Sequence, residues 1–192
     1  MPSTRFIPSP GSRPEPARAV DAINAYVAAR DGNRPHALLT AFTEDARLTI
    51  RGDAARIGLP SQAAGRAAIA EALVTGFHKT WENIYTFCIG TRPQDDAREF
   101  SCDWMMAMSA KRDGLPMIGC GRYDWHFEAG GHRARSLSIT IAALQIPRCD
   151  ADVVTDWVCA FPYPWCARAR IITSPPPVPQ LVAIVERLKT SS

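Results

Sequence analysis

The stretch from Arg98 to Gln145 reads REFSCDWMMAMSAKRDGLPMIGCGRYDWHFEAGGHRARSLSITIAALQ. Apolar side chains recur there at every second position, which is the period of β-strands whose two faces meet different surroundings. Asp113-Gly114 and Gly130-Gly131 interrupt the alternation, and such dipeptides favour tight hairpin turns because they accept positive φ. Together with the run before it, the stretch predicts four antiparallel strands, at about 83–90, 98–110, 115–128 and 132–145.

The alternation also separates the two faces of these strands. One face carries aromatic and large aliphatic side chains, and we expect it to pack against helices. The other face is polar, and we expect it to meet water or a second subunit. The apolar set is Phe100, Cys102, Trp104, Met106, Met108, Tyr123, Trp125, Phe127, Leu137, Ile139 and Ile141. The polar set is Ser101, Asp103, Arg122, Asp124, His126, Glu128, Ser136, Ser138 and Thr140.

Three segments with helical spacing precede these strands. The first runs from about Pro16 to Asp31-Gly32-Asn33, where glycine is expected to end it in the left-handed region. The second is expected to start with Asn33 as its cap and Pro35 in its first turn, and the third spans Gly65–Gly76. A short strand, Arg47–Arg51, separates these two. Helices followed by a meander indicate an α+β domain, with three N-terminal helices packed on a curved antiparallel sheet.

Proline marks the expected boundaries of the domain. Of the 16 prolines, five lie in residues 1–16 and seven lie at or after Pro147. This distribution predicts a disordered leader at 1–15, a folded domain at 16–146 and an irregular Pro- and aromatic-rich extension at 147–192. The extension ends in an amphipathic helix, expected to dock either as a lid over a pocket or as a structural clasp. Its apolar residues are Leu181, Val182, Ile184, Val185 and Leu188.

The composition is that of a folded chain without an evident macromolecular partner. Of 192 residues, 46% are hydrophobic and 21% are charged, and the net charge is +3. Neither nucleic-acid binding nor a membrane span is expected, because the charge is balanced and no apolar run approaches about 20 residues. The start of the chain has no apolar signal segment before its first prolines, which favours a cytoplasmic address.

The cysteines and short motifs point away from cofactor chemistry. Cys88, Cys102 and Cys120 fall in strand-like runs, where a thiol packs as a small hydrophobe. Cys159 and Cys166 flank a rigid loop and could close a disulfide, or stay reduced as in most cytoplasmic chains. The sequence has no zinc, phosphate-loop or nucleophile-elbow motif, so we expect no metal and no organic cofactor.

Several local runs occur in an order that is shared with one superfamily. They are Ala25-Tyr26 before Asp31-Gly32, Phe42-Thr43-Glu44-Asp45-Ala46, Gly65-Arg66-Ala67-Ala68-Ile69, and Gly121-Arg122-Tyr123 with Gly130-Gly131. In these runs the sequence resembles the nuclear transport factor 2-like superfamily, and specifically its SnoaL-like branch. The resemblance implies a cone over residues 16–146 in which the curled sheet and helices enclose a pocket, and a homodimer across the outer face of the sheet. It implies no single activity, because the superfamily includes isomerases, polyketide cyclases, dehydratases and non-catalytic modules.

The resemblance to ketosteroid isomerases also suggests roles for individual residues. It implies that Tyr26 donates a hydrogen bond to a developing enolate oxygen, and that Tyr123 occupies the position of a second donor. The position of the general-base aspartate falls on Ile50, which cannot move a proton, so that reaction is not expected here. His78, near the end of the third helix, is the alternative base, since its imidazole titrates near neutral pH. The other possibility is that His78 is a surface or packing residue.

These residues predict a function in outline. Tyr26 and His78 are the catalytic candidates, and the predicted pocket lining is Phe42, Ile50, Trp104, Tyr123 and Trp125. We expect a small, largely apolar carbonyl or hydroxyl compound to bind there and to be isomerised, cyclised or dehydrated without a cofactor. The alternative is a non-catalytic dimeric binding or scaffold module whose aromatic interior is solid core. The pair Asp124 and His126 is assigned to the outer surface.

Overall fold

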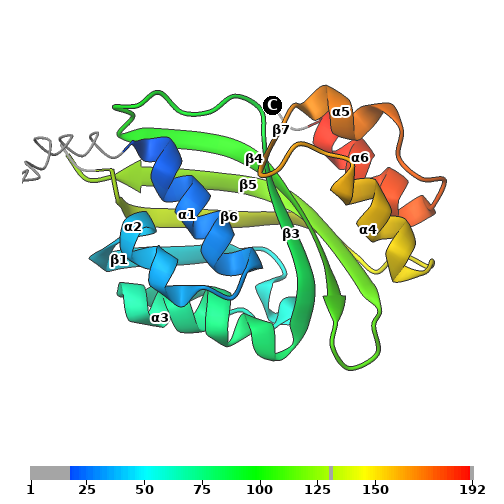
Figure 1. The fold of residues 1–192 in the computed structure, drawn as a ribbon, viewed down its shortest axis with the longest axis horizontal. Helices are drawn as coiled ribbons and strands as arrows, with labels where there is room; N and C mark the ends of the chain where they lie inside the picture. The colour runs from blue at the N-terminus through cyan, green and yellow to red at the C-terminus, as the bar shows by residue number, and fades with distance from the viewer. Residues whose placement is uncertain (1–17, 130–131, 191–192) are drawn as a thin grey trace, which may run out of the picture.

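The computed structural model describes residues 18–129 and 132–190 (Figure 1). The predicted leader and the predicted turn at Gly130-Gly131 lie outside the described residues. Seven strands form one sheet in the order β2-β1-β6-β5-β4-β3-β7. The strands are β1 (Phe42–Arg51), β2 (Gln62–Ala64), β3 (Trp81–Ile89), β4 (Glu99–Ala110), β5 (Pro116–Phe127), β6 (Ala134–Gln145) and β7 (Trp165–Cys166). The four long predicted strands are therefore confirmed as β3 to β6, within two residues at each end.

The sheet is mixed, so the prediction of a curved antiparallel sheet holds for the meander and was wrong for the two flanking strands. Strands β3 to β6 pair antiparallel as a meander, but β1 pairs parallel with β6 and β7 pairs parallel with β3. Two strands joined by a tight hairpin must run antiparallel, whereas strands joined by a longer connection can run either way. The chain between β1 and β3 passes through helical turns and the short β2, so no hairpin fixes the direction of β1 relative to β6. Strand β1 also starts at Phe42, five residues before the predicted Arg47.

Helical segments occupy the chain between these strands and before them. Helix α1 lies across one face of the sheet, and α3 runs alongside β1 (Figure 1). The α-helices here are α1 (Ala19–Asp31), α2 (Leu38–Ala41) and α3 (Arg66–Ala70). Shorter turns are η1 (Pro35–Ala37), η2 (Ala54–Ile57), η3 (Glu71–Thr75) and η4 (Phe77–Lys79). The third predicted helix thus consists of α3 and the π-helical turn η3 that continues it.

The end of α1 differs in detail from the prediction. Gly32 has φ −97°, whereas Asn33 has φ 50° and makes the left-handed reversal. Asparagine tolerates this conformation better than other residues with a Cβ atom, since its short side chain can bond locally. Asn33 is therefore not the cap of the second helical segment, and Arg34 precedes η1 instead.

The inner face of the sheet holds the main core, as the alternation predicted. The whole predicted apolar set packs there with α1, α2 and α3, and Phe100 is its most exposed member. The outer face holds a second core that the sequence analysis missed. The strand residues in it occupy the alternate positions, namely Phe87, Ile89, Met105, Ala107, Ile118 and Cys120. Strands β3 to β5 are therefore buried on both faces along part of their length.

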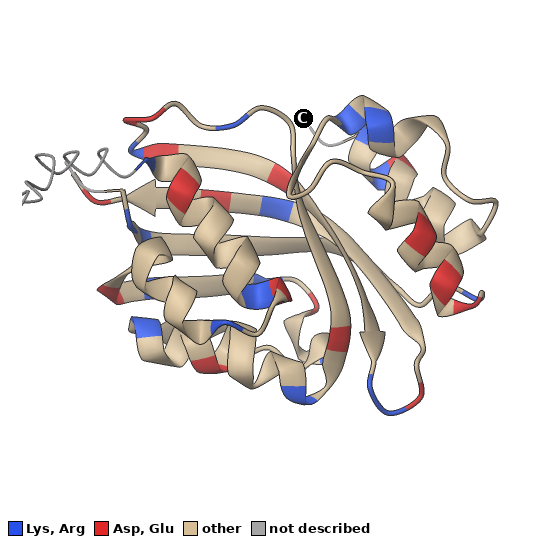
Figure 2. Cartoon of the chain, in the orientation of Figure 1, with Lys and Arg blue, Asp and Glu red and all other residues tan. Residues whose placement is uncertain are grey.

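The C-terminal extension covers this outer core. It forms α4 (Ala151–Cys159), α5 (Arg168–Thr173) and α6 (Pro179–Thr190), which lie together at one end of the sheet (Figure 1). Acidic residues lie on α4 and basic residues on α5 (Figure 2). Leu181, Ile184 and Leu188 of α6 are buried in the outer core. Because this core lies on the face opposite to the aromatic interior, α6 is a clasp and not a lid.

The extension also changes two expectations for polar side chains. Asp103, predicted to face solvent or a partner, is buried under the extension and forms a 2.5 Å ion pair with Arg168. Cys159 and Cys166 are both free, with Cys159 exposed and Cys166 buried, so the loop between them is not closed by a disulfide. Among the described residues, no helix is both long enough and apolar enough to cross a membrane.

We predict that α6 contributes measurably to the stability of the whole fold. Ile184→Ala should lower the free energy of unfolding by about 2–5 kcal/mol, because it leaves a cavity between α6 and the sheet. Val182→Ala on the same helix, where Val182 is 38% exposed, should change it by less than about 0.5 kcal/mol. Urea unfolding followed by circular dichroism measures both. Equal, small effects would contradict the docking of α6.

Candidate functional site

The inner core brings most of the predicted site residues into one aromatic cluster. Helix α1 places Tyr26 against β1 and β5, where its ring meets those of Phe42, Tyr123 and Trp125 at centroid distances of 6.1, 5.7 and 5.3 Å. All these contacts are edge-on, an arrangement that aromatic quadrupoles favour. All four rings are fully buried. The structure therefore brings Tyr26, Phe42, Tyr123 and Trp125 together, and their role in binding a ligand stays a prediction.

Trp104 joins this cluster because two glycines make room for it. Its indole stacks on Tyr123 at a centroid distance of 5.6 Å. It lies over the backbone of β5 at Gly119 and Gly121, where a Cβ atom on Gly121 would come within 2.9 Å of the indole and 1.9 Å of the Thr140 carbonyl oxygen. The run Gly119-Cys120-Gly121 thus serves close packing.

The sequence analysis missed the central polar residue of this interior. Arg30, one helical turn after Tyr26, is 3% exposed. Its Nη1 donates to the Tyr26 hydroxyl at 3.1 Å, its Nη2 donates to Met106 Sδ at 2.8 Å, and its guanidinium lies 4.8 Å from the centroid of the Phe77 ring. Residues four apart share a helix face. That spacing was the available signal, because Tyr26 was already predicted to point inward.

The polar groups of this interior are mainly donors. Arg30 donates to Tyr26, and the Tyr26 hydroxyl donates to that of Tyr123 at 3.4 Å. The Tyr123 hydroxyl accepts from Tyr26 and keeps its own proton to donate, and within the described part of the chain Arg30 Nε, Trp104 Nε1 and Trp125 Nε1 have no partner. Burial raises the pKa of the Tyr123 phenol well above its usual range, so this hydroxyl stays a neutral donor.

His78 and Ile50 lie in different surroundings. His78, in η4, has its Nε2 2.5 Å from the backbone carbonyl oxygen of Arg30. Because a carbonyl accepts, this nitrogen carries the proton, and only Nδ1 is left as a base. Among the described interactions, none joins His78 directly to the aromatic cluster. Ile50 is buried in the inner core and supplies only apolar surface. The catalytic role of His78 remains a prediction.

Asp31, the residue after Arg30, connects α1 to β3 and to the C-terminal extension by hydrogen bonds. Its carboxylate accepts from the Thr86 backbone N–H at 2.6 Å, from the Thr86 hydroxyl at 2.7 Å and from the Tyr163 hydroxyl at 2.9 Å. Burial raises the pKa of Asp31 to about 6, against the hydrogen bonds from Thr86 and the charge of Arg30, which lower it. Asp31 therefore titrates within the physiological range.

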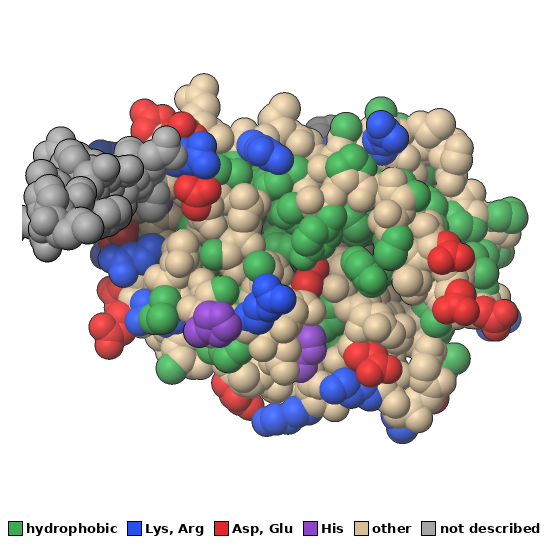
Figure 3. All heavy atoms as spheres, in the orientation of Figure 1, with side chains coloured by type: hydrophobic (Ala, Val, Ile, Leu, Met, Phe, Trp, Pro, Cys, Tyr) green, Lys and Arg blue, Asp and Glu red, His purple; other side chains and the backbone are tan. Residues whose placement is uncertain are grey.

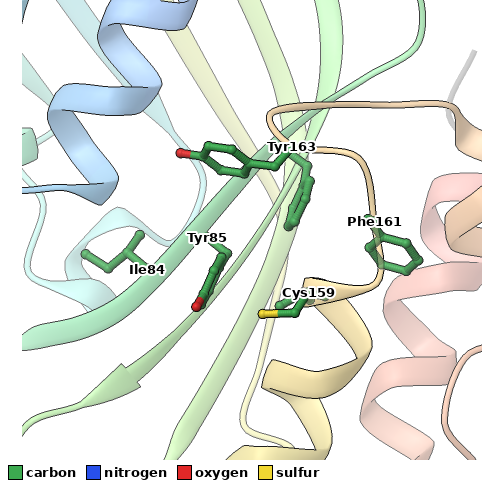
Figure 4. Close-up of a pocket in the computed structure, with 7 residues that line it drawn as sticks. Ile84, Tyr85, Cys159, Phe161 and Tyr163 are labelled. Carbon is green, nitrogen blue, oxygen red and sulfur yellow. The ribbon is translucent and has the colours of Figure 1, made fainter.

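A pocket lies outside the aromatic interior. This pocket of about 210 Å³ opens between β3, α4 and the loop before β7, and its lining is mostly apolar. Figure 4 shows Tyr85 and Cys159 facing each other across it, with Tyr163 and Phe161 along the loop. A hydrogen bond with Cys159 raises the pKa of Tyr85. On the surface, hydrophobic side chains gather between α1 and the C-terminal helices (Figure 3). The full lining is Ile84, Tyr85, Phe87, Val158, Cys159, Phe161 and Tyr163.

Comparison with known proteins identifies the fold. No family model matches the sequence, and no curated protein matches it. Solved structures do match, and several of them are described as nuclear transport factor 2-like proteins or as having a ketosteroid isomerase-like fold. The chain therefore has the nuclear transport factor 2-like fold.

Three of these structures show how far the likeness extends. TerC co-crystallised with polyporic acid gives a TM-score of 0.52 at 16% identity, over 64% of this chain and 90% of TerC. A nuclear transport factor 2-like protein of unknown function from Burkholderia pseudomallei gives 0.53 at 15%, over 64% and 89%. The hexachlorocyclohexane dehydrochlorinase LinA type 2 gives 0.52 at 11%, over 66% and 84%. At these identities the likeness concerns the fold and not the activity.

We predict that Asp31 makes stability depend on pH. A carboxyl whose pKa is raised by folding stabilises the native state below its unfolded pKa, and this contribution is lost as the pH rises through about 6. Asp31→Asn removes that titration. Between pH 4 and pH 7 the wild type should therefore lose on the order of 2 kcal/mol of its free energy of unfolding through Asp31, and the variant should not lose this amount.

The measurement is urea unfolding at several pH values, with Asp96→Asn at an exposed loop position as the control. Wild type and the control should give parallel curves. A curve for Asp31→Asn that is also parallel to them would contradict the perturbed carboxyl.

Proposed function

We propose that the protein binds a small, largely apolar carbonyl or hydroxyl compound in the interior of the cone and isomerises, cyclises or dehydrates it. The observation that carries the proposal is the hydroxyl pair of Tyr26 and Tyr123, held in an apolar interior with a proton left to donate. A buried hydroxyl without an acceptor is destabilising by about 1–3 kcal/mol, and an oxygen of a ligand would remove that penalty. Trp104 and Trp125 add planar surface on which a ring can stack.

The chemistry that these groups support is stabilisation of charge on a ligand oxygen. Donors fixed before the reaction favour an enolate or alkoxide over the neutral carbonyl, which is the electrophilic half of isomerisation or dehydration. The proton-abstracting half needs a base. Asp103 is buried but pairs with Arg168 on the outer face, and the Asp31 carboxylate is bound by Thr86 and Tyr163. His78 Nδ1 is our candidate base, and the protein needs no cofactor for this reaction.

Two neighbours in fold are consistent with this proposal. TerC was crystallised with an organic acid, and LinA is a dehydrochlorinase. They illustrate that this architecture holds small organic molecules and serves elimination chemistry. They do not identify a ligand for this chain.

The second candidate is a non-catalytic module, and one observation favours it. The interior rings are buried and in mutual contact, as in a solid core. A guest must then displace a side chain, and Met106 is the most adaptable one present because it is long and unbranched. Native mass spectrometry of the purified protein separates the candidates. A small molecule that co-purifies, or that binds when added, favours the binding protein. No bound small molecule at any tested ligand concentration favours the scaffold.

We also propose that the protein forms a homodimer through the part of the outer sheet face that the extension leaves uncovered. The polar side chains Ser101, Arg122 and Asp124 lie there and bond to each other, with Arg122 3.1 Å from Asp124. Sedimentation equilibrium should give twice the mass of the chain. If Arg122→Glu lowers the mass to that of one chain, the contact lies on this face. A monomeric wild type would contradict the proposal.

We predict that the Tyr26 hydroxyl contributes to ligand affinity. With 1-naphthol as the probe, Tyr26→Phe should weaken binding about 3- to 10-fold, because it removes the neutral hydrogen bond that holds the Tyr123 hydroxyl toward the ligand oxygen. Tyr85→Phe is the matched control, since its hydroxyl lies in the outer pocket, and it should leave the affinity unchanged. Fluorescence titration measures both. Weakening by Tyr85→Phe alone would move the ligand to the outer pocket and overturn the proposal.

A further inference from the structure

The interior of the cone contains a positive charge that makes none of the ion pairs found among the described residues. Arginine is permanently protonated in a protein, and Arg30 is only 3% exposed. Its described partners are a phenol hydroxyl, a thioether sulfur and the face of Phe77. The neighbouring carboxylate of Asp31 is bound to Thr86 and Tyr163 instead. Asp31 thus acts on Arg30 only through its field, and a buried charge without a directly bonded counter-ion is unfavourable.

The hydrogen bonds around Arg30 reinforce this imbalance. Arg30 Nε is buried and has no partner in the described part of the chain, and the same holds for Trp104 Nε1 and Trp125 Nε1. The exposed fractions of Arg30, Trp104 and Trp125 are 3, 2 and 1%. Arg30 donates a hydrogen bond to Tyr26, and Tyr26 in turn donates one to Tyr123. Each of these groups offers a proton, and the acceptors that the described residues supply are two phenol oxygens and a thioether sulfur.

We infer that the natural ligand carries a negative charge on oxygen, as a carboxylate or phenolate attached to a planar ring. This inference rests on the proposed binding site and names the class of compound that it takes. Oxygen anions form shorter and stronger hydrogen bonds to a guanidinium than a thioether does, so the ligand oxygen replaces Met106 Sδ as the acceptor from Arg30. The Tyr26 and Tyr123 hydroxyls then bond the same anion or a neighbouring oxygen, and the indoles of Trp104 and Trp125 pack against the ring.

The test compares two probes that have the same ring system and nearly the same size. At pH 7.5, 1-naphthoate is an anion and 1-naphthamide is neutral. Wild type should bind 1-naphthoate at least 10-fold more tightly than 1-naphthamide, measured by isothermal titration calorimetry. Arg30→Met keeps the length of the side chain and removes the charge, and it should reduce this ratio to about 1. Arg34→Met, at an exposed position close by, is the matched control and should keep the ratio of wild type.

Stability without ligand separates a binding role from a structural one. If Arg30 is present for the ligand, Arg30→Met relieves a buried unpaired charge and the midpoint of thermal unfolding stays equal or rises. 1-Naphthoate should then raise the midpoint of wild type and not that of the variant. A structural role of Arg30 predicts a lower midpoint for Arg30→Met together with an unchanged ratio of affinities, and this result would overturn the inference.

The remaining outcomes distinguish this inference from the proposed function. Equal binding of both probes to wild type overturns the requirement for a charge and leaves the binding site in place. Binding of neither probe, nor of 1-naphthol, overturns both. Should Arg30→Met fail to fold, Arg30→Lys keeps the charge but loses the planar fork. It should weaken 1-naphthoate several-fold and leave 1-naphthamide unchanged, and an unchanged affinity for 1-naphthoate would count against the inference.

Discussion

The structure depends on the burial of strands β3 to β5 on both faces. Their even and odd positions both carry apolar side chains along part of their length, so that a single layer of helices could not remove them all from water. Helices α1 to α3 cover one face and the C-terminal helices cover the other. This requirement explains why the chain continues well beyond its last long strand, and why residues at opposite ends of the sequence contact the same sheet.

The C-terminal turn of α1 is where the two halves of the molecule meet. Tyr26 and Arg30 point into the aromatic interior, while Asp31 bonds to Thr86 on β3 and to Tyr163 in the extension. Nearer the start of α1, Asn24 accepts a hydrogen bond from the Trp165 indole at 2.8 Å. The orientation of α1, and with it the position of the interior donors, is therefore fixed partly by the extension. A ligand that shifts α1 must act against these contacts.

The parts that could be predicted from the sequence are those set by local periodicity. The alternation of Trp104, Met106 and Met108 gave the inner face of β4 correctly, and the resemblance placed Tyr26 and Tyr123 beside each other. The outer core was missed because the run Trp104-Met105-Met106-Ala107-Met108 was divided into faces, although its continuous apolar character is typical of a strand buried on both sides. Arg30 was missed for another reason: arginine inside a core is rare, and only its spacing from Tyr26 marked it. The parallel pairing of β1 with β6 involves residues far apart in sequence and leaves no local pattern.

The two-residue strand β7 has an effect on how the chain reaches this fold. Cys88 and Gly90 donate their backbone N–H groups to the carbonyl oxygens of Pro164 and Cys166, so part of β3 is not left as an open edge. Open edges of sheets pair readily with strands of other molecules. During synthesis on the ribosome, β3 and the outer apolar face are complete long before β7 and α6 emerge. The C-terminal extension thus covers both an edge and an apolar face through which unfinished molecules could otherwise associate, and this protection forms only after the extension has been synthesised.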